Sequence, residues 1–206
     1  MVRYAADTGY TGGMTVRTPD PDDLPDDPTA GGPASNPAWL SDIELAEARR
    51  RLPFLYVEGV PVRTDGSGQV TEIGLLLRAS PMGEISHTVV SGRVRYGETV
   101  RDALFRHIEN DLGPMAFPIL PASPQPFAVA EYFPMPGVSA FHDDRQHAVS
   151  LAFVVPVTGT CEPRQDALEV TWMTPAEAAS EALAEEMEGG RGVLVRQALA
   201  HLGLLR

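Results

Sequence analysis

The chain has 206 residues, with 16 basic and 28 acidic side chains, a formal net charge of -12 and one cysteine. Its longest apolar run, residues 148–157, is broken by Ser150 and Pro156, so no segment offers the ~18–20 apolar residues that span a bilayer. The acidic balance also argues against a polymeric nucleic-acid partner, because binding to a phosphate backbone needs a basic surface.

The first 36 residues have little apolar content. They hold five Pro and five Gly, and residues 19–28 read PDPDDLPDDP. Such a segment cannot bury enough surface to offset the entropy lost on ordering. We therefore expect an acidic N-terminal arm over 1–36 and a single domain over 37–206. The domain starts near Trp39, where Ser41 and Glu44 have the spacing of a capping box before a helix that runs to about Arg51.

Strand patterns fill much of the domain. Apolar and β-branched residues predict strands over 55–64, 72–78, 85–94, 127–133, 147–157 and 168–173. The DGSG sequence at 65–68 predicts a tight turn, and the helical period returns over 175–187 and 193–204. Strands around one central helix, with more helix at the end, predict an α/β (α+β) fold in which a central mixed sheet lies between helices.

The central helix has the clearest pattern in the chain. An apolar stripe at helical spacing is formed by Val100, Leu104, Ile108 and Leu112. Thr99 and Asp102 cap its start, and Gly113 followed by Pro114 ends it.

A recognisable motif joins the third strand, a glycine turn at Gly97 and this helix. It resembles the Nudix box, G-x5-E-x7-R-E-U-x-E-E-x-G-U, where U is a bulky apolar residue. The matched positions are Gly92, Glu98, Arg106, Ile108 and Gly113. Asp111 conservatively replaces the last box glutamate, whereas His107 and Asn110 replace the other two. The resemblance spans about residues 54–183 and implies a Nudix-like α/β/α sandwich with a degenerate box.

The resemblance also implies a metal-dependent site on this helix. At ~100° per residue, His107, Asn110 and Asp111 fall within one arc of the helix surface. The family places metal-binding carboxylates there, so Asp111 is expected to be the surviving metal ligand and a catalytic residue, with His107 and Asn110 as auxiliary ligands. The implied cofactor is a divalent metal, Mn²⁺ or Mg²⁺, and imidazole suits Mn²⁺ better.

Other box residues have structural roles in the family. The resemblance implies that Glu98 and Arg106 form an ion pair that supports the turn. Gly92, Gly97 and Gly113 are the expected turn glycines.

A second polar cluster lies in the loop over 141–147. Asp143 or Asp144 is a candidate for the extra carboxylate that Nudix enzymes take from outside the box, and we assign Asp144 a catalytic role. Arg145 is a candidate for binding a substrate phosphate. The alternative is a polar turn in which the aspartates bond to their own backbone.

The expected function is metal-dependent hydrolysis of a pyrophosphate linkage in a nucleoside-diphosphate compound. The alternative is a non-catalytic module that binds or senses a nucleotide or diphosphate, since two box carboxylates are replaced. The resemblance implies a homodimer. The N-terminus lacks the apolar core of an export signal and the lone cysteine cannot form an internal disulfide, so we expect a cytoplasmic protein.

Overall fold

The computed structural model describes residues 40–79, 85–163 and 167–205, so the predicted arm over 1–36 lies outside the described residues. The strands are β1 (Phe54–Thr64), β2 (Val70–Ala79), β3 (Ile85–Thr88), β4 (Val90–Arg93), β5 (Ala116–Pro118), β6 (Ala128–Phe133), β7 (Phe141–His142), β8 (Ala148–Gly159) and β9 (Ala167–Met173). The helices are α1 (Asp42–Arg51), α2 (Val100–Leu112), α3 (Pro175–Ala178), α4 (Glu181–Glu186) and α5 (Arg191–His201), with a short 3-10 turn, η3 (Glu188–Gly190). None of the helices in these ranges is long and apolar enough to cross a membrane.

The strands form the mixed sheet that the sequence predicts. Its main path runs β3-β2-β1-β8-β6-β7, with β4 beside β1, β5 beside β8 and β9 beside β2. The central pair, β1 and β8, is parallel over nine registered residue pairs, from Phe54 with Ala148 to Val62 with Pro156. Most of the other pairings are antiparallel.

Along one edge, strand β1 pairs with two different strands, β2 and β4. Its C-terminal part, from Val62 to Thr64, pairs with β2, whereas residues 56–59 pair with β4. Strands β2 and β4 therefore diverge from a common partner, which leaves the last residues of β2 beside β3 and β9. This divergence positions the site described below.

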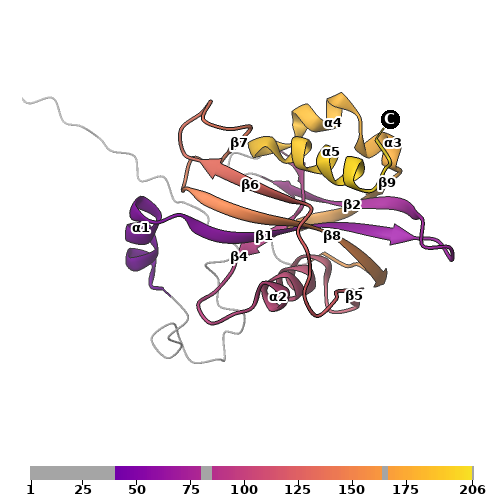
Figure 1. Cartoon of the computed structure of the whole chain (residues 1–206), viewed down its shortest axis with the longest axis horizontal. Helices are drawn as coiled ribbons and strands as arrows, with labels where there is room; N and C mark the ends of the chain where they lie inside the picture. The colour runs from indigo at the N-terminus through magenta and orange to yellow at the C-terminus, as the bar shows by residue number, and fades with distance from the viewer. Residues whose placement is uncertain (1–39, 80–84, 164–166, 206) are drawn as a thin grey trace, which may run out of the picture.

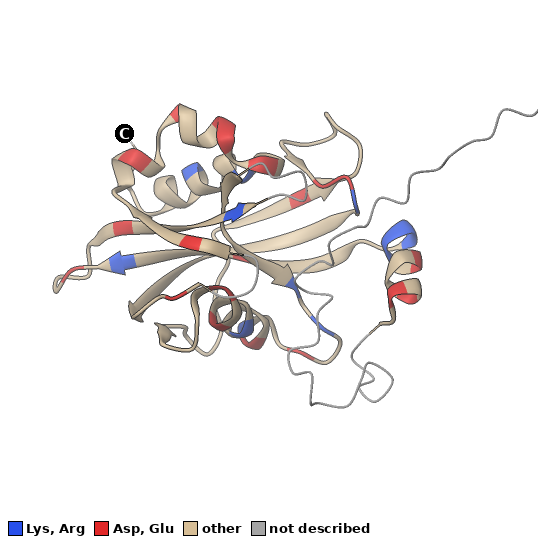
Figure 2. Ribbon diagram, turned by 180° about the vertical axis from the view of Figure 1, so that it is seen from behind, with Lys and Arg blue, Asp and Glu red and all other residues tan. Residues whose placement is uncertain are grey.

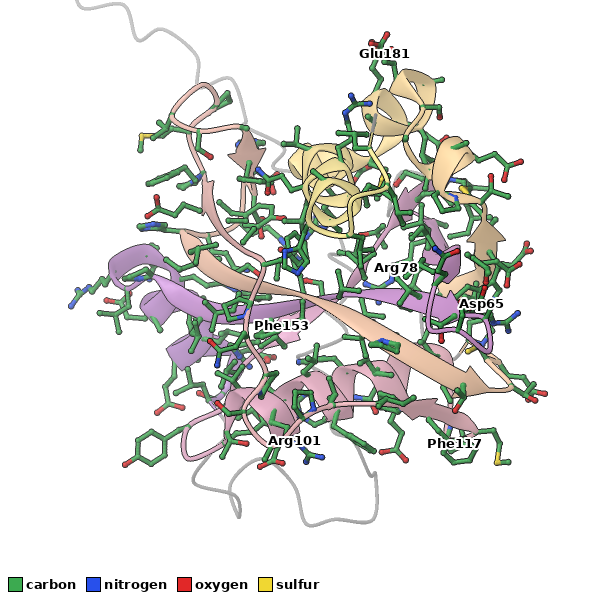
Figure 3. All side chains as sticks on the ribbon, turned by 45° about the vertical axis from the view of Figure 1, so that its right-hand side comes forward. Asp65, Arg78, Arg101, Phe117, Phe153 and Glu181 are labelled. Atoms are coloured by element: carbon green, nitrogen blue, oxygen red, sulfur yellow. The ribbon has the colours of Figure 1, made fainter. Side chains whose placement is uncertain are left out.

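Helices cover both faces of the sheet (Figure 1). On one face α2 buries its apolar stripe against β1, β8 and their neighbours, and Phe153 lies in that layer (Figure 3). On the other face α3, α4 and α5 pack over β1, β2, β6 and β8. The predicted sandwich of helices around a central mixed sheet is thus confirmed.

Short sequence patterns determine where most of the helices and strands lie. Ser41 and Glu44 form the expected capping box of α1, and Thr99 caps α2. The single helix expected over 175–187 is instead two, because Ser180 starts a new helix by accepting a hydrogen bond from the Leu183 backbone. The strand expected over 85–94 is also two, β3 and β4.

Candidate functional site

An ion pair between Glu98 and Arg106 holds the turn before α2. Arg106 Nε and Nη2 each donate to a different carboxylate oxygen of Glu98 at 2.8 Å, and Nη2 also donates to the Arg93 carbonyl at 2.9 Å. Burial alone would raise the pKa of Glu98, but hydrogen bonds from Arg106 and the Arg95 backbone hold that pKa below its usual range. The pair ties β4, the turn and α2 into one unit.

The three box glycines stand where a side chain is poorly tolerated. Gly97 and Gly113 have φ of 78° and 91°, which favours glycine. At Gly113 a Cβ would also lie 2.5 Å from the Glu162 carbonyl oxygen. At Gly92 the constraint is contact with the ring of His107, because a Cβ would lie 1.8 Å from its Cε1.

His107 is turned toward the sheet. Its side chain is buried, and Nε2 lies 3.1 Å from the Arg93 carbonyl oxygen, which can only accept a hydrogen bond. Both ring nitrogens lie 2.2 Å from where a Cβ of residue 92 would stand. The ring therefore presents both nitrogens to β4. Asn110 is half-buried on the same helix.

Asp111, the carboxylate expected to be the surviving metal ligand, forms an ion pair with Arg78 of β2. Arg78 Nη2 donates to Asp111 Oδ1 at 2.7 Å. The two side chains are 23% and 5% exposed respectively, so the contact is largely shielded from solvent. The pair links α2 to the part of β2 that has diverged from β1, a link that the sequence analysis did not foresee.

These contacts do not fit the divalent metal that the family resemblance implies. Hard cations such as Mg²⁺ need several oxygen ligands, and the family supplies them as carboxylates. Here Asp111 is paired with a guanidinium, and the imidazole nitrogens of His107 face β4. Within the described ranges, no group of three or more His, Cys, Asp and Glu side chains is arranged to hold a metal ion.

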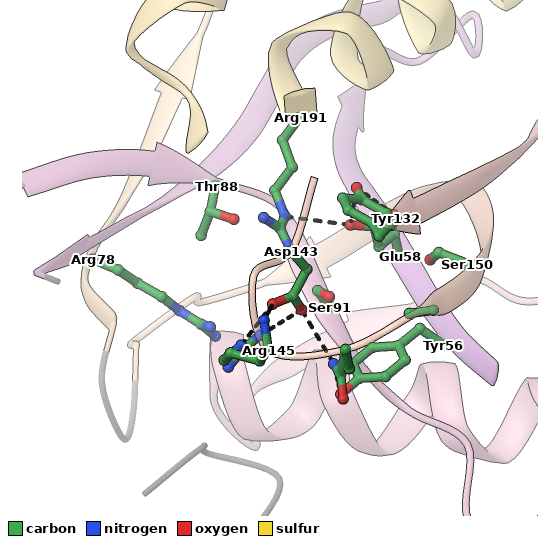
Figure 4. A pocket seen from close by; sticks show the side chains of 12 residues that line it. Tyr56, Glu58, Arg78, Thr88, Ser91, Tyr132, Asp143, Arg145, Ser150 and Arg191 are labelled. Carbon is green, nitrogen blue, oxygen red and sulfur yellow. Dashed lines mark hydrogen bonds and ion pairs between the residues drawn. The ribbon is translucent and has the colours of Figure 1, made fainter. Parts of the chain in front are cut away.

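A pocket opens next to this ion pair. It is lined by Tyr56, Glu58, Arg78, Thr88, Ser91, Tyr132, Asp143, Arg145, Gln146, Ala148, Ser150 and Arg191. Figure 4 shows three arginines converging on it from β2, from the loop after β7 and from the start of α5. Arg78 thus lines the pocket and also contacts α2, the helix that carries the box.

The inner end of the pocket is built around Glu58, which is 1% exposed in the middle of β1. Tyr132 donates its hydroxyl to Glu58 at 2.8 Å, and Arg191 Nε lies 3.3 Å from the same carboxylate. Burial, and then the charge of Glu58, raise the pKa of Tyr132 well above its usual range, so Tyr132 stays a proton donor. Ser150 lines the pocket with a buried hydroxyl that has no hydrogen-bond partner in the described part of the chain.

The loop over 141–147 forms the rim. Arg145 Nε and Nη2 donate to the two carboxylate oxygens of Asp143 at 2.9 and 3.0 Å. Burial would raise the pKa of Asp143, but the hydrogen bonds and charge of Arg145 lower it. Gln146 donates to Asp143 and to the Tyr56 hydroxyl, and it accepts from Arg49 of α1.

Part of this rim was predicted from the sequence. Arg145 does line the pocket, whereas Asp144 is exposed and is not among the lining residues. Glu58, Arg78 and Arg191 were missed. Only Glu58 carried a signal, as a lone carboxylate inside the apolar run LYVEGVPV.

Comparison with solved structures points to one fold. A structure from Jonesia denitrificans, described as a possible asymmetric diadenosine tetraphosphate hydrolase, is 60% identical, with a TM-score of 0.73 over 76% of this chain and 98% of that one. A NUDIX hydrolase from Nitrosomonas europaea is 12% identical, with a TM-score of 0.54 over 72% of this chain and 90% of that one. The NUDIX domain of Shewanella oneidensis NrtR, solved with ADP-ribose, is 13% identical, with a TM-score of 0.50 over 79% and 99%.

A family model described as a domain of unknown function, DUF4916, matches residues 35–204. No curated protein matches the sequence significantly. These matches are consistent with the motif on α2 and with the divergent mixed sheet. The chain belongs to the DUF4916 family, and it has the fold of the Nudix hydrolases.

Proposed function

We propose that this protein binds a nucleoside-diphosphate-type compound in the arginine-lined pocket and acts as a binding or sensing module. The observation that carries the proposal is the convergence of Arg78, Arg145 and Arg191 on one pocket. Guanidinium groups recognise phosphate oxygens through several fixed N–H donors. Each arginine is oriented by a carboxylate, namely Asp111, Asp143 or Glu58.

The pocket also suits the rest of such a ligand. The Glu58 carboxylate and the Ser150 hydroxyl offer hydrogen-bonding atoms for ribose hydroxyls or base N–H groups. Helix α5 begins at Arg191, which lines the pocket, so the positive end of the helix dipole lies near it. We place the phosphates near Arg78 and Arg145 and the nucleoside toward Glu58 and Arg191.

Hydrolysis is the second candidate, and the J. denitrificans protein favours it. That structure is 60% identical and is described as a possible asymmetric diadenosine tetraphosphate hydrolase. The sequence-based assignment of Asp111, His107 and Asn110 as metal ligands, with Asp144 as a further catalytic residue, belongs to this candidate. Hydrolysis ranks second because Arg78 pairs with Asp111 and because His107 faces β4.

Calorimetric titration tests the proposal with ADP, ADP-ribose and diadenosine tetraphosphate as probes. We expect Arg145→Ala to weaken binding about tenfold or more, because hydrogen bonds to charged groups are each worth about 1.5–3 kcal/mol. Arg101→Ala on α2 is the matched control, since Arg101 does not line the pocket. Phosphorus NMR of the same mixtures with Mg²⁺ or Mn²⁺ reports turnover.

The outcomes are distinct. Binding without turnover supports the module, and turnover with Mn²⁺ supports the second candidate. No binding of any of the three probes refutes the proposal. We also propose a homodimer in the cytoplasm, and analytical ultracentrifugation tests the dimer.

A further inference from the structure

Arg78 holds a position that the sequence gives no reason to expect. Its strand, β2, leaves β1 after Val62–Thr64, and β4 takes over as the partner of β1. The Arg78 side chain lies where these strands have parted, between α2 and the C-terminal helices (Figure 3). From there it contacts Asp111 of the box helix and also lines the pocket.

The Arg78 guanidinium has one buried donor, Nε, without a partner in the described part of the chain. An arginine has five N–H donors, and Nη2 gives one of them to Asp111. A buried unpaired donor is unfavourable, so a ligand oxygen that accepts from Arg78 would recover that cost.

The box carboxylate Asp111 already has a positively charged partner. In the Nudix family the box carries several carboxylates, and bound divalent cations offset both these charges and those of the phosphates. Of the three glutamates that follow the arginine in the box, one carboxylate remains in this chain, Asp111, and the Arg78 guanidinium sits 2.7 Å from it. A cation placed beside Asp111 would meet the fixed positive charge of Arg78 at short range, which is unfavourable in a part-buried site.

We propose that Arg78 stands in for the divalent cation, so that this site binds the diphosphate of its ligand without metal. Arg78 is the ligand-contacting residue, and Asp111 is a positioning residue that holds the guanidinium at the junction of α2 and the pocket. This inference rests on the proposed function for the identity of the ligand. It differs from a purely structural role of the ion pair, which would leave ligand affinity and metal dependence unaffected.

The first test needs no nucleotide and no variant. Electron paramagnetic resonance of Mn²⁺ added to the full chain reports directly whether the box takes up the metal. We expect the spectrum of free Mn²⁺ only. Bound Mn²⁺ that disappears in Asp111→Asn would overturn the inference, whatever the nucleotide does.

The second test compares the affinity for ADP and for diadenosine tetraphosphate in EDTA and with Mn²⁺. We expect dissociation constants that agree within about threefold, and a loss of about tenfold or more in Arg78→Met. Asp111→Asn should weaken binding less than Arg78→Met, and Mn²⁺ should not restore the affinity of either variant. Glu109→Gln, an exposed carboxylate on the same helix, is the matched control.

The two tests distinguish failure of this inference from failure of the proposed function. Affinity that rises about tenfold with Mn²⁺ and falls in Asp111→Asn would show a metal site and overturn the inference. If neither nucleotide binds under any condition, the proposed function fails, and the Mn²⁺ spectrum alone decides whether Arg78 has replaced the metal. Should Arg78→Met not fold, Arg78→Lys tests the same point, because lysine keeps the charge but loses the planar set of donors.

Discussion

Gly92→Ala tests the orientation of His107, on which the argument against a metal ligand depends. Gly92 lies on β4, and a Cβ there would stand 1.8 Å from His107 Cε1 and 2.2 Å from each ring nitrogen. Those distances are far inside van der Waals contact. The ring cannot simply swing away, because His107 is 3% exposed and bonded to the Arg93 carbonyl.

The size of the effect follows from this overlap. Forcing extra volume into a packed site typically costs about 1–3 kcal/mol, and an overlap with a buried ring belongs at the upper end. For a chain of this size, about 3 kcal/mol lowers the melting temperature by roughly 6–12 °C. Gly59→Ala is the matched control, since its nearest contact is the flexible end of Leu104 at 3.3 Å and the expected loss is well below that of Gly92→Ala.

Urea unfolding of a double-mutant cycle measures the coupling. His107→Ala destabilises the chain by itself, but it removes the ring that the new methyl group strikes. The double variant should therefore be no less stable than His107→Ala alone, giving a favourable interaction equal to the cost of Gly92→Ala, about 3 kcal/mol. If Gly92→Ala costs less than about 0.5 kcal/mol, or if the two changes are additive, the ring points elsewhere and His107 returns as a candidate metal ligand.

Three further predictions concern the contacts that frame the site. Glu98→Gln should cost about 1.5–3 kcal/mol at pH 7; because the pKa of Glu98 is lowered by folding, this difference should vanish in urea titrations as pH falls through that pKa. Asp143→Asn should release Arg145 and weaken ADP binding severalfold in calorimetry, and the wild type should lose the same affinity only in acid, since the pKa of Asp143 is lowered. Gly190→Ala should lower the melting temperature in calorimetric scans, because residue 190 has a φ of 84° and its Cβ would lie 2.2 Å from a backbone oxygen.

Features set by residues close in the sequence were predictable. The Thr99 cap and the apolar stripe that ends at Leu112 define α2 within one segment, and the structure places the helix at Val100–Leu112. Glu98 lies in the turn before α2 and Arg106 lies two helical turns into α2, so they are close in the sequence and their ion pair was predictable. The sequence predicted a mixed sheet but not the order of its strands, which local patterns do not encode.

The chemistry of the site was not predictable in the same way. Asp111 looked like a metal ligand because its helix position matches the box, but its partner Arg78 lies 33 residues earlier on another strand. Nothing in the local pattern of β2 marks Arg78 as a residue that crosses to α2. That contact depends on the divergence of β2 and β4 from β1, which is a property of the assembled sheet.

The distribution of charge suits a small anion better than a long one. Each arginine of the pocket is matched by a carboxylate, so the pocket attracts phosphate through oriented donors more than through excess charge. Around it, the exposed acidic side chains of the C-terminal helices include Glu177, Glu181, Glu185, Glu186 and Glu188 (Figure 2). Surface charges act over about 8 Å at physiological salt, so the repulsion on a small ligand comes only from the acidic side chains nearest to the pocket. A polynucleotide would extend across the acidic surface, and the same chain, with its net charge of -12, would repel it.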